Sequence, residues 1–100
     1  MTKTDLYNQL KQEQLKMDIE AIRWRKWALN TYCEESAEEY NAIAERDENE
    51  AMGVFKARMA LLPKYKGRLN EESSRLLNKY LDMKHELEAL QKQKLQKEVA

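Results

Sequence analysis

The chain has 100 residues, of which 36% are charged and 42% are apolar, and its formal net charge is zero. Two glycines, one proline and few β-branched residues favour long helices and argue against a β fold. The single cysteine excludes an intrachain disulfide, no apolar run approaches the ~20 residues of a membrane helix, and the first residues lack the apolar core of a signal peptide. We therefore expect one soluble, cytoplasmic, all-α domain of three to four helices.

Residues 1–33 are predicted to form a long helix with two apolar sides. The helix is expected to begin near Thr2 or Thr4, and Thr2 with Asp5 has the spacing of a capping box. At about 100° per residue, one apolar stripe contains Leu15, Ile19, Ile22, Leu29 and Cys33, and the opposite stripe contains Leu6, Leu10, Met17, Ala21, Trp24 and Ala28. A surface helix needs only one such stripe. The second stripe predicts a second contact, either with another helix of the chain or with another protein.

Residues 34–62 are predicted to form a middle helix, or two shorter helices, with acidic residues first and basic residues after them. A capping-box pattern begins at Ser36, so a break near residues 30–36 is one option and a continuous helix is the other. A similar pattern beginning at Asp47 offers a further helix start. One apolar face follows, with the spacing of a helix, at Met52, Phe55, Met59 and Leu62.

Pro63 is expected to end this helix, because the residue before a proline is kept out of the α region. Residues 63–69 then form a basic loop, and residues 70–95 form a C-terminal helix that begins at Asn70, while residues 91–100 fray. The apolar positions of the last helix alternate in steps of four and three residues, and this pattern is long enough for an antiparallel helical hairpin: Leu76, Tyr80, Met83, Leu87 and Leu90. We expect an antiparallel hairpin in which this face packs against the apolar face of the middle helix.

The most unusual local string is Arg23, Trp24, Arg25, Lys26 and Trp27. The two tryptophans are three residues apart and are therefore neighbours on a helix. Because tryptophan and arginine are enriched at the energetic centres of protein interfaces, one interpretation is an anchor for a partner protein. In a second interpretation, Trp24 belongs to the core and Trp27 to its boundary. In a third, the rings stack on bases and the basic residues bind phosphates.

The predicted loop offers a second candidate binding site, which comprises Pro63, Lys64, Tyr65, Lys66 and Arg68. Its basic residues suit a contact with nucleic acid or with an acidic protein surface, and the alternative is an exposed turn without a partner. Pro63 forms the only X-Pro bond of the sequence. A prolyl isomerase that recognises this chain through proline would therefore have to use Pro63.

Nothing in the sequence indicates an enzyme, a cofactor or a metal centre. His85 has no second histidine, and the one cysteine is distant in sequence, which excludes a zinc site of ordinary ligand type. Cys33 lies on an apolar stripe and is expected to be a small buried residue. The chain also lacks a P-loop and any glycine-rich phosphate motif. We therefore expect a protein without catalytic activity.

The whole chain, which is small, helical, rich in lysine and glutamate and nearly free of glycine, resembles the anti-RecBCD accessory proteins of lambdoid phages, as do its aromatic-basic string Arg23–Trp27 and its single loop proline Pro63. The resemblance implies a phage-encoded protein that acts in the host cytoplasm. It implies that the protein docks on the RecBCD helicase-nuclease and alters the response of that enzyme to DNA ends. It also implies recruitment of a host prolyl isomerase, for which Pro63 is the available residue.

Three functions remain as hypotheses. In the first, the chain is a small modulator that buries a Trp24-centred stripe against a large host protein complex such as RecBCD. In the second, the chain is a homo-oligomeric, coiled-coil-like structural or assembly protein, because self-association would also cover a two-sided helix. In the third, the chain binds nucleic acid directly through residues 23–27 and 64–68.

Overall fold

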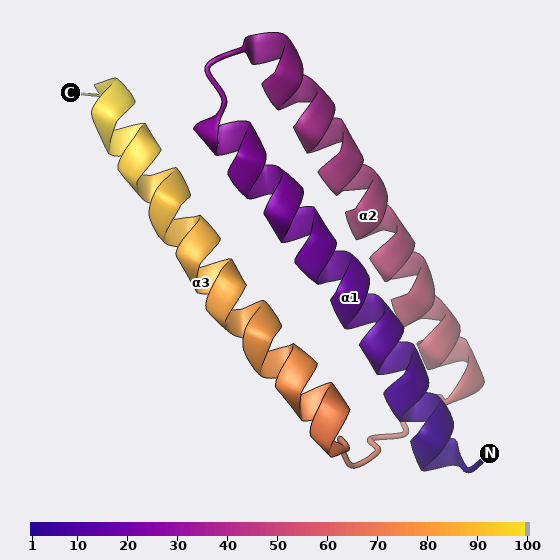
Figure 1. The fold of residues 1–100 in the computed structure, drawn as a ribbon. Coiled ribbons are helices and arrows are strands. Elements are labelled where there is room, and N and C mark those ends of the chain that lie inside the picture. The colour runs from indigo at the N-terminus through magenta and orange to yellow at the C-terminus, as the bar shows by residue number, and fades with distance from the viewer. Residues whose placement is uncertain (100) are drawn as a thin grey trace.

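The structure is a computed structural model that describes residues 1–99, with side chains described through Glu98. The protein is all-α and consists of three helices, which are α1 (Lys3–Asn30), α2 (Glu34–Leu61) and α3 (Glu71–Val99). The helices lie side by side in an elongated molecule of 52 × 22 × 19 Å (Figure 1). The capping box at the start of α1 is present, since Thr2 Oγ1 accepts from the Asp5 N–H and Asp5 Oδ2 accepts from the Thr2 N–H.

Helix α1 lies between the other two helices, and this central position explains why it carries two apolar stripes. Over the described residues, α1 packs against α2 and against α3, while α2 and α3 do not pack against each other (Figure 1). Leu15 and Ile19 form a buried core with Leu76 of α3. On the opposite stripe, Trp24 meets Tyr40 of α2. The second contact that the sequence predicts is therefore made within the chain.

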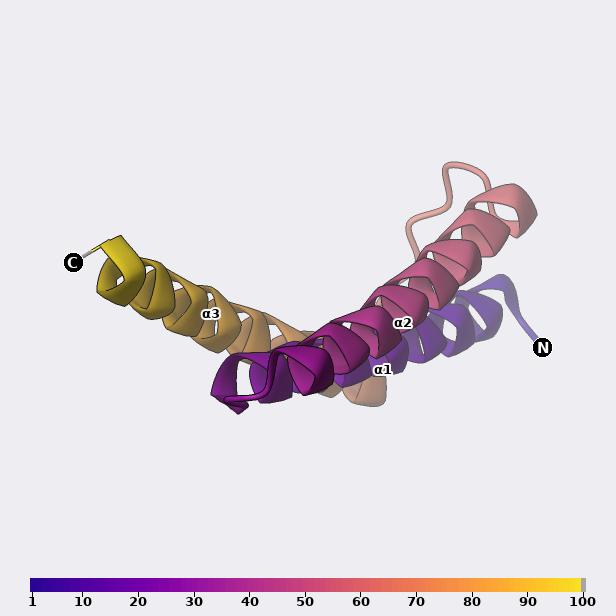
Figure 2. The same cartoon turned by 90° about the horizontal axis from the view of Figure 1, so that it is seen from above.

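The expected hairpin between the middle and last helices is wrong. Of its predicted contact residues on α2, Met52 and Met59 are 51% and 46% exposed. The chain instead crosses after α2 to the other side of α1, and α3 is inclined to the α1–α2 pair (Figure 2). This arrangement is favoured because α1 offers two apolar stripes, so each of the other helices buries its own apolar face against α1.

The break before α2 is real and α2 begins at residue 34, but the helix starts expected from the capping patterns at Ser36 and Asp47 are wrong. Cys33 is the N-cap of α2, its side chain makes no capping hydrogen bond, and Ser36 and Asp47 both lie inside the helix. Cys33 is also exposed rather than buried, because the chain leaves the helical path at residues 31–33 and the apolar stripe ends there. Glu34 and Glu35 in the first turn favour this start, since carboxylates stabilise the positive end of a helix.

Pro63 ends α2 as expected. Leu62 has φ −130° and ψ 62°, outside the α region, and its side chain is buried. The Tyr65 N–H donates to the Leu62 carbonyl at 3.2 Å and closes a β-turn with Pro63 at the second position and Lys64 at the third. Lys64 has φ 59°, the positive value that the third position of a type II turn requires. This turn directs the chain back toward α1.

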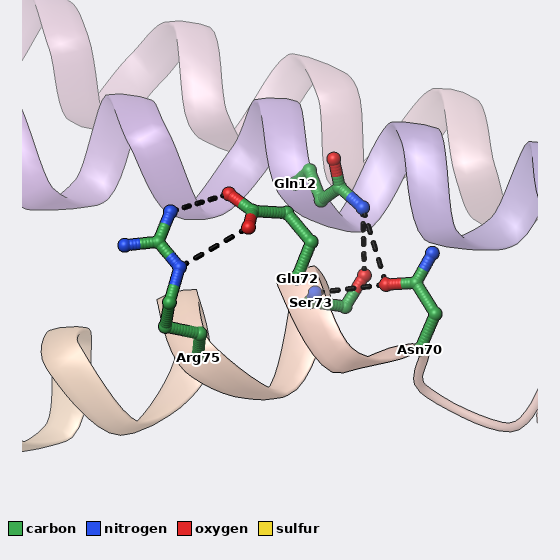
Figure 3. A network of polar contacts seen from close by, with 5 residues as sticks. All are labelled: Gln12, Asn70, Glu72, Ser73 and Arg75. Carbon is green, nitrogen blue, oxygen red and sulfur yellow. Dashed lines mark hydrogen bonds and ion pairs between the residues drawn. The ribbon is translucent and has the colours of Figure 1, made fainter.

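Polar contacts hold the start of α3 against α1. Asn70 Oδ1 accepts from the Ser73 N–H at 2.9 Å, which is the N-cap interaction expected from the sequence. Gln12 of α1 donates to Asn70 Oδ1 and to Ser73 Oγ, at 3.3 and 3.1 Å, while Glu72 and Arg75 of α3 pair with each other (Figure 3). The fully buried Ser73 hydroxyl is thereby satisfied.

Helix α3 is longer than expected. It extends to Val99, so the expected end at residue 95 and the expected fraying of residues 91–99 are wrong, while residue 100 lies outside the described residues. The helix continues because residues 91–99 contain no glycine or proline and consist mainly of lysine, glutamine, leucine and glutamate, which favour helix.

Candidate functional site

The candidate binding residues lie at the two ends of α1. The string Arg23–Trp27 lies near the turn between α1 and α2, whereas residues 63–68 lie beside Tyr7 near the start of α1. Seventeen residues separate Tyr7 from Trp24, which corresponds to about 26 Å along a helix. The two groups therefore form separate surfaces.

An aromatic cluster, defined by Trp24, Trp27 and Tyr40, connects α1 to α2. The ring centroids of Trp24 and Trp27 are 5.1 Å apart in an edge-to-face arrangement, and the Tyr40 ring lies 5.6 Å from Trp24 and 6.0 Å from Trp27. Trp24 is half-buried, while Trp27 is 58% exposed. Neighbouring Tyr32, in the turn, is fully exposed. The cluster thus contributes to packing and also presents a large aromatic surface to solvent.

The basic residues of the string are paired within the chain. Arg25 forms an ion pair with Glu48 of α2 at 2.6 Å and donates to Asn41 Oδ1 at 3.0 Å. Lys26 pairs with Glu86 of α3 at 2.8 Å, and Arg23 pairs with a glutamate one turn earlier on α1. The Arg25 and Lys26 pairs join α2 and α3 to α1, although exposed ion pairs contribute at most about 1 kcal/mol each. Trp27 is the member of the string that is left most available to a partner.

A pocket of about 310 Å³ lies at the other end of α1, next to the loop. We call it the loop pocket, and it is lined by Tyr7, Arg58, Met59, Lys64, Tyr65 and Lys66. Arg58 is only 8% exposed, and its guanidinium lies 5.1 Å from the Tyr7 ring centroid and 5.3 Å from that of Phe55. The buried Arg58 Nε has no hydrogen-bond acceptor among the described residues.

Tyr65 connects the loop to α1. The Tyr65 hydroxyl hydrogen-bonds the Thr4 hydroxyl, and the Tyr65 and Tyr7 rings meet edge to face at 5.8 Å. The side chains of Pro63 and Arg68 are exposed. Lys11 lies one turn beyond Tyr7 on α1, and its pKa is lowered by burial and then by the nearby positive charge of Arg58.

A second pocket, of about 260 Å³, lies where the three helices approach one another. Its lining includes Asp18 and Arg25 of α1, Glu48 of α2 and Lys84 of α3. Burial, and then the charge of Glu48, raise the pKa of Asp18. The mixture of acids and bases gives this pocket no clear preference for an anion or a cation.

Other candidate chemistry is sparse. Among residues 1–99, no group of three or more His, Cys, Asp and Glu residues could hold a metal ion, and His85 is exposed. The N–H groups at the start of α2, that of Ser36 foremost, lower the pKa of the exposed Cys33 thiol because they stabilise the thiolate. None of the described helices has the length and apolarity that crossing a membrane requires.

Comparisons with protein-family models, with curated proteins and with solved structures find no match to this chain. The site is therefore defined by its own residues. Sequence reasoning missed Tyr7 and the buried Arg58. One available signal was a repeat of seven residues, because the buried residues of α2 are Ala44, Ala51 and Arg58. Such a repeat marks the face of a long helix that packs against a neighbour, and it places Arg58 on that face.

Proposed function

We propose that this chain is a non-enzymatic protein-binding module that docks on a larger protein through the aromatic cluster. The observation that carries this proposal is the 58% exposure of Trp27, at the edge of a cluster whose other members hold it in place. A large aromatic side chain fixed by its neighbours loses little conformational entropy on binding. Such side chains are enriched among the residues that contribute most to binding energy.

The surroundings of the cluster favour a protein partner with a basic rim. The first turns of α2 start beside Tyr32 and carry four exposed carboxylates, at Glu34, Glu35, Glu38 and Glu39. Complementary charges at the rim of an interface speed association and select partners. The same carboxylates would repel a nucleic acid strand, which disfavours base stacking at this end of the molecule.

The proposed partner is a host DNA-processing enzyme, with the RecBCD helicase-nuclease as the specific candidate. This part of the proposal rests on the resemblance of the chain to anti-RecBCD accessory proteins, and it includes a phage origin and action in the host cytoplasm. A host prolyl isomerase is a further proposed partner, since the Pro63 side chain is exposed in the loop at the opposite end of α1.

The test is direct binding of the tagged chain to purified RecBCD, measured by biolayer interferometry. Trp27→Ala should weaken binding at least about tenfold, because loss of an interface anchor costs more than about 1.4 kcal/mol. Leu81→Ala, which truncates a 40% exposed apolar residue on α3, is the matched control and should bind normally. Equal binding of both variants would refute the role of the cluster, and no binding of the unmodified chain would refute RecBCD as the partner.

A second candidate function is self-assembly, which is favoured by the uncovered apolar face of α2. Met52 and Met59 are seven residues apart on this face and are 51% and 46% exposed. Two copies that pair through this face would bury it symmetrically. Self-assembly predicts a melting temperature that rises with protein concentration. A Met59→Glu variant should abolish that dependence, and a concentration-independent monomer by light scattering would exclude this candidate.

A further inference from the structure

We propose that the loop pocket is a phosphate-binding site that takes the phosphate group of a nucleotide or of a single nucleic acid strand. This site lies at the opposite end of α1 from the aromatic cluster and does not depend on the protein-docking function. Its elements are the buried guanidinium of Arg58, two lysines of the loop and two tyrosine rings.

The first argument is the uncompensated charge of Arg58. The side chain is more than nine-tenths buried and lines the pocket, yet none of the ion pairs of the described residues includes it. A buried charge is costly unless it is paired. The rings of Tyr7 and Phe55 offset part of this cost through cation–π contacts. An anion in the pocket would supply the counter-charge that the Arg58 guanidinium lacks among the described residues.

The second argument is that the charged residues that line the loop pocket are all positive. Lys64 and Lys66 line the same pocket, and no carboxylate does. The segment of residues 51–68 carries five basic residues and no acidic one. Lys11 approaches from α1 closely enough for the charge of Arg58 to act on it. Charges of one sign around a pocket with low-dielectric walls attract the opposite charge.

The third argument is the conformation of Lys64. It occupies the third position of the Pro63 turn with φ 59°, in the left-handed region where glycine would avoid the steric strain of a Cβ. A lysine at this position makes the fold less stable than a glycine would, but it places a positive charge at the pocket. A Lys64→Gly variant therefore distinguishes an effect on folding from an effect on binding, because glycine should stabilise the fold while it removes a positive charge from the site.

The aromatic lining of the loop pocket favours a phosphate ester of a nucleoside over a simple carboxylate as the ligand. Tyr7 and Tyr65 line the pocket beside the basic residues, and their rings hold each other edge to face. An aromatic ring beside basic side chains is the combination that binds a base and its phosphate together. The volume of about 310 Å³ lies at the lower end of the range for small-ligand pockets, about 300–1,000 Å³.

The experiment is isothermal titration calorimetry of the full chain in a low-salt buffer without phosphate. The probes are inorganic phosphate, adenosine 5′-monophosphate, adenosine, a short oligothymidylate and a polyglutamate peptide. Arg58→Met keeps an unbranched apolar side chain in place of the arginine stem and removes the charge, and it should weaken the phosphate probes at least about tenfold. Lys64→Gly should weaken them about threefold while it raises the melting temperature. The control Lys79→Gln, which removes one exposed lysine on α3, should change neither quantity.

The proposal is supported if adenosine monophosphate or the oligonucleotide binds, adenosine does not, and the two pocket variants lose affinity. Tighter binding of the oligonucleotide, with a steep loss of affinity in salt, identifies a nucleic acid strand as the source of the phosphate. Tighter binding of the mononucleotide identifies a free nucleotide. Unchanged affinity in Lys64→Gly and Arg58→Met overturns the proposal, and so does polyglutamate binding as tight as that of the phosphate probes. Because Lys64→Gly should be more stable than the unmodified chain, the test does not depend on the folding of Arg58→Met.

Discussion

Replacing Asn8 by alanine should remove about 2–3 kcal/mol from the free energy of unfolding, because this one side chain holds the loop against α1. Asn8 is 2% exposed. Its Nδ2 donates to the Arg68 carbonyl at 3.0 Å and to the Thr4 carbonyl at 2.9 Å, and its Oδ1 accepts from the Asn70 N–H at 2.8 Å. Truncation leaves the loop carbonyl and the Asn70 N–H without these partners.

The size of this loss of stability follows from the two backbone groups, the Arg68 carbonyl and the Asn70 N–H, that lose their hydrogen-bond partner. Each unsatisfied buried group costs about 1–3 kcal/mol, and the lower part of that range applies because the contacts are only partly buried, which gives about 2–4 kcal/mol together. Alanine returns about 0.5 kcal/mol because it favours helix more than asparagine does. For a chain of this size, the net loss corresponds to a decrease of about 10–20 °C in the melting temperature.

The assays are urea denaturation followed by circular dichroism and hydrogen exchange at the Asn70 amide. The control is Asn78→Ala, which changes an exposed asparagine on α3 and should stabilise the protein slightly through helix propensity alone. In Asn8→Ala, the Asn70 amide should also exchange faster. The reasoning is refuted if Asn8→Ala is as stable as Asn78→Ala and the protection of the Asn70 amide does not change.

Further predictions concern two glycines and one carboxylate, all measured by thermal denaturation. Gly53→Ala should stabilise α2 by about 1 kcal/mol, since a Cβ there meets no atom within 4 Å, whereas Gly67→Ala should destabilise the protein by about 1–3 kcal/mol, since its Cβ would lie 2.8 Å from the Tyr65 ring. Equal effects at the two glycines would contradict this reasoning. Because burial, and then Glu48, raise the pKa of Asp18, the folded protein binds more protons than the unfolded chain just above pH 3.8, and stability falls as pH rises through this window. Asp18→Asn should therefore raise the melting temperature at neutral pH and not well below pH 3.8, and a decrease at neutral pH would contradict it.

Local features of the fold could be predicted because their causes are local. The Thr2 capping box, the end of α2 before Pro63 and the N-cap at Asn70 depend on residues within a few positions of one another. The start of α2 could not be fixed in this way. The capping-box pattern begins at Ser36, whereas the N-cap is Cys33, whose side chain makes no capping hydrogen bond.

The candidate sites were only partly predictable for a similar reason. The sequence identifies Trp27 and the basic loop as unusual, but it does not indicate that Arg25 and Lys26 pair with Glu48 and Glu86 of the neighbouring helices. It also gives no weight to Arg58, whose partners in the loop pocket come from α1 and from the loop. These contacts join residues far apart in the sequence, so periodicity within one helix carries little information about them.

By itself, the sequence determined that the protein is helical, that its first helix has two apolar sides, and where the chain turns at Pro63. Only the tertiary structure decided that α1 lies between α2 and α3, which leaves Met52 and Met59 exposed. The physical reason is that an apolar stripe specifies burial without specifying its partner, since the hydrophobic effect has no direction. The partner is selected by contacts such as those of Asn8 with the loop and Gln12 with Ser73, which form only when the helices are already side by side.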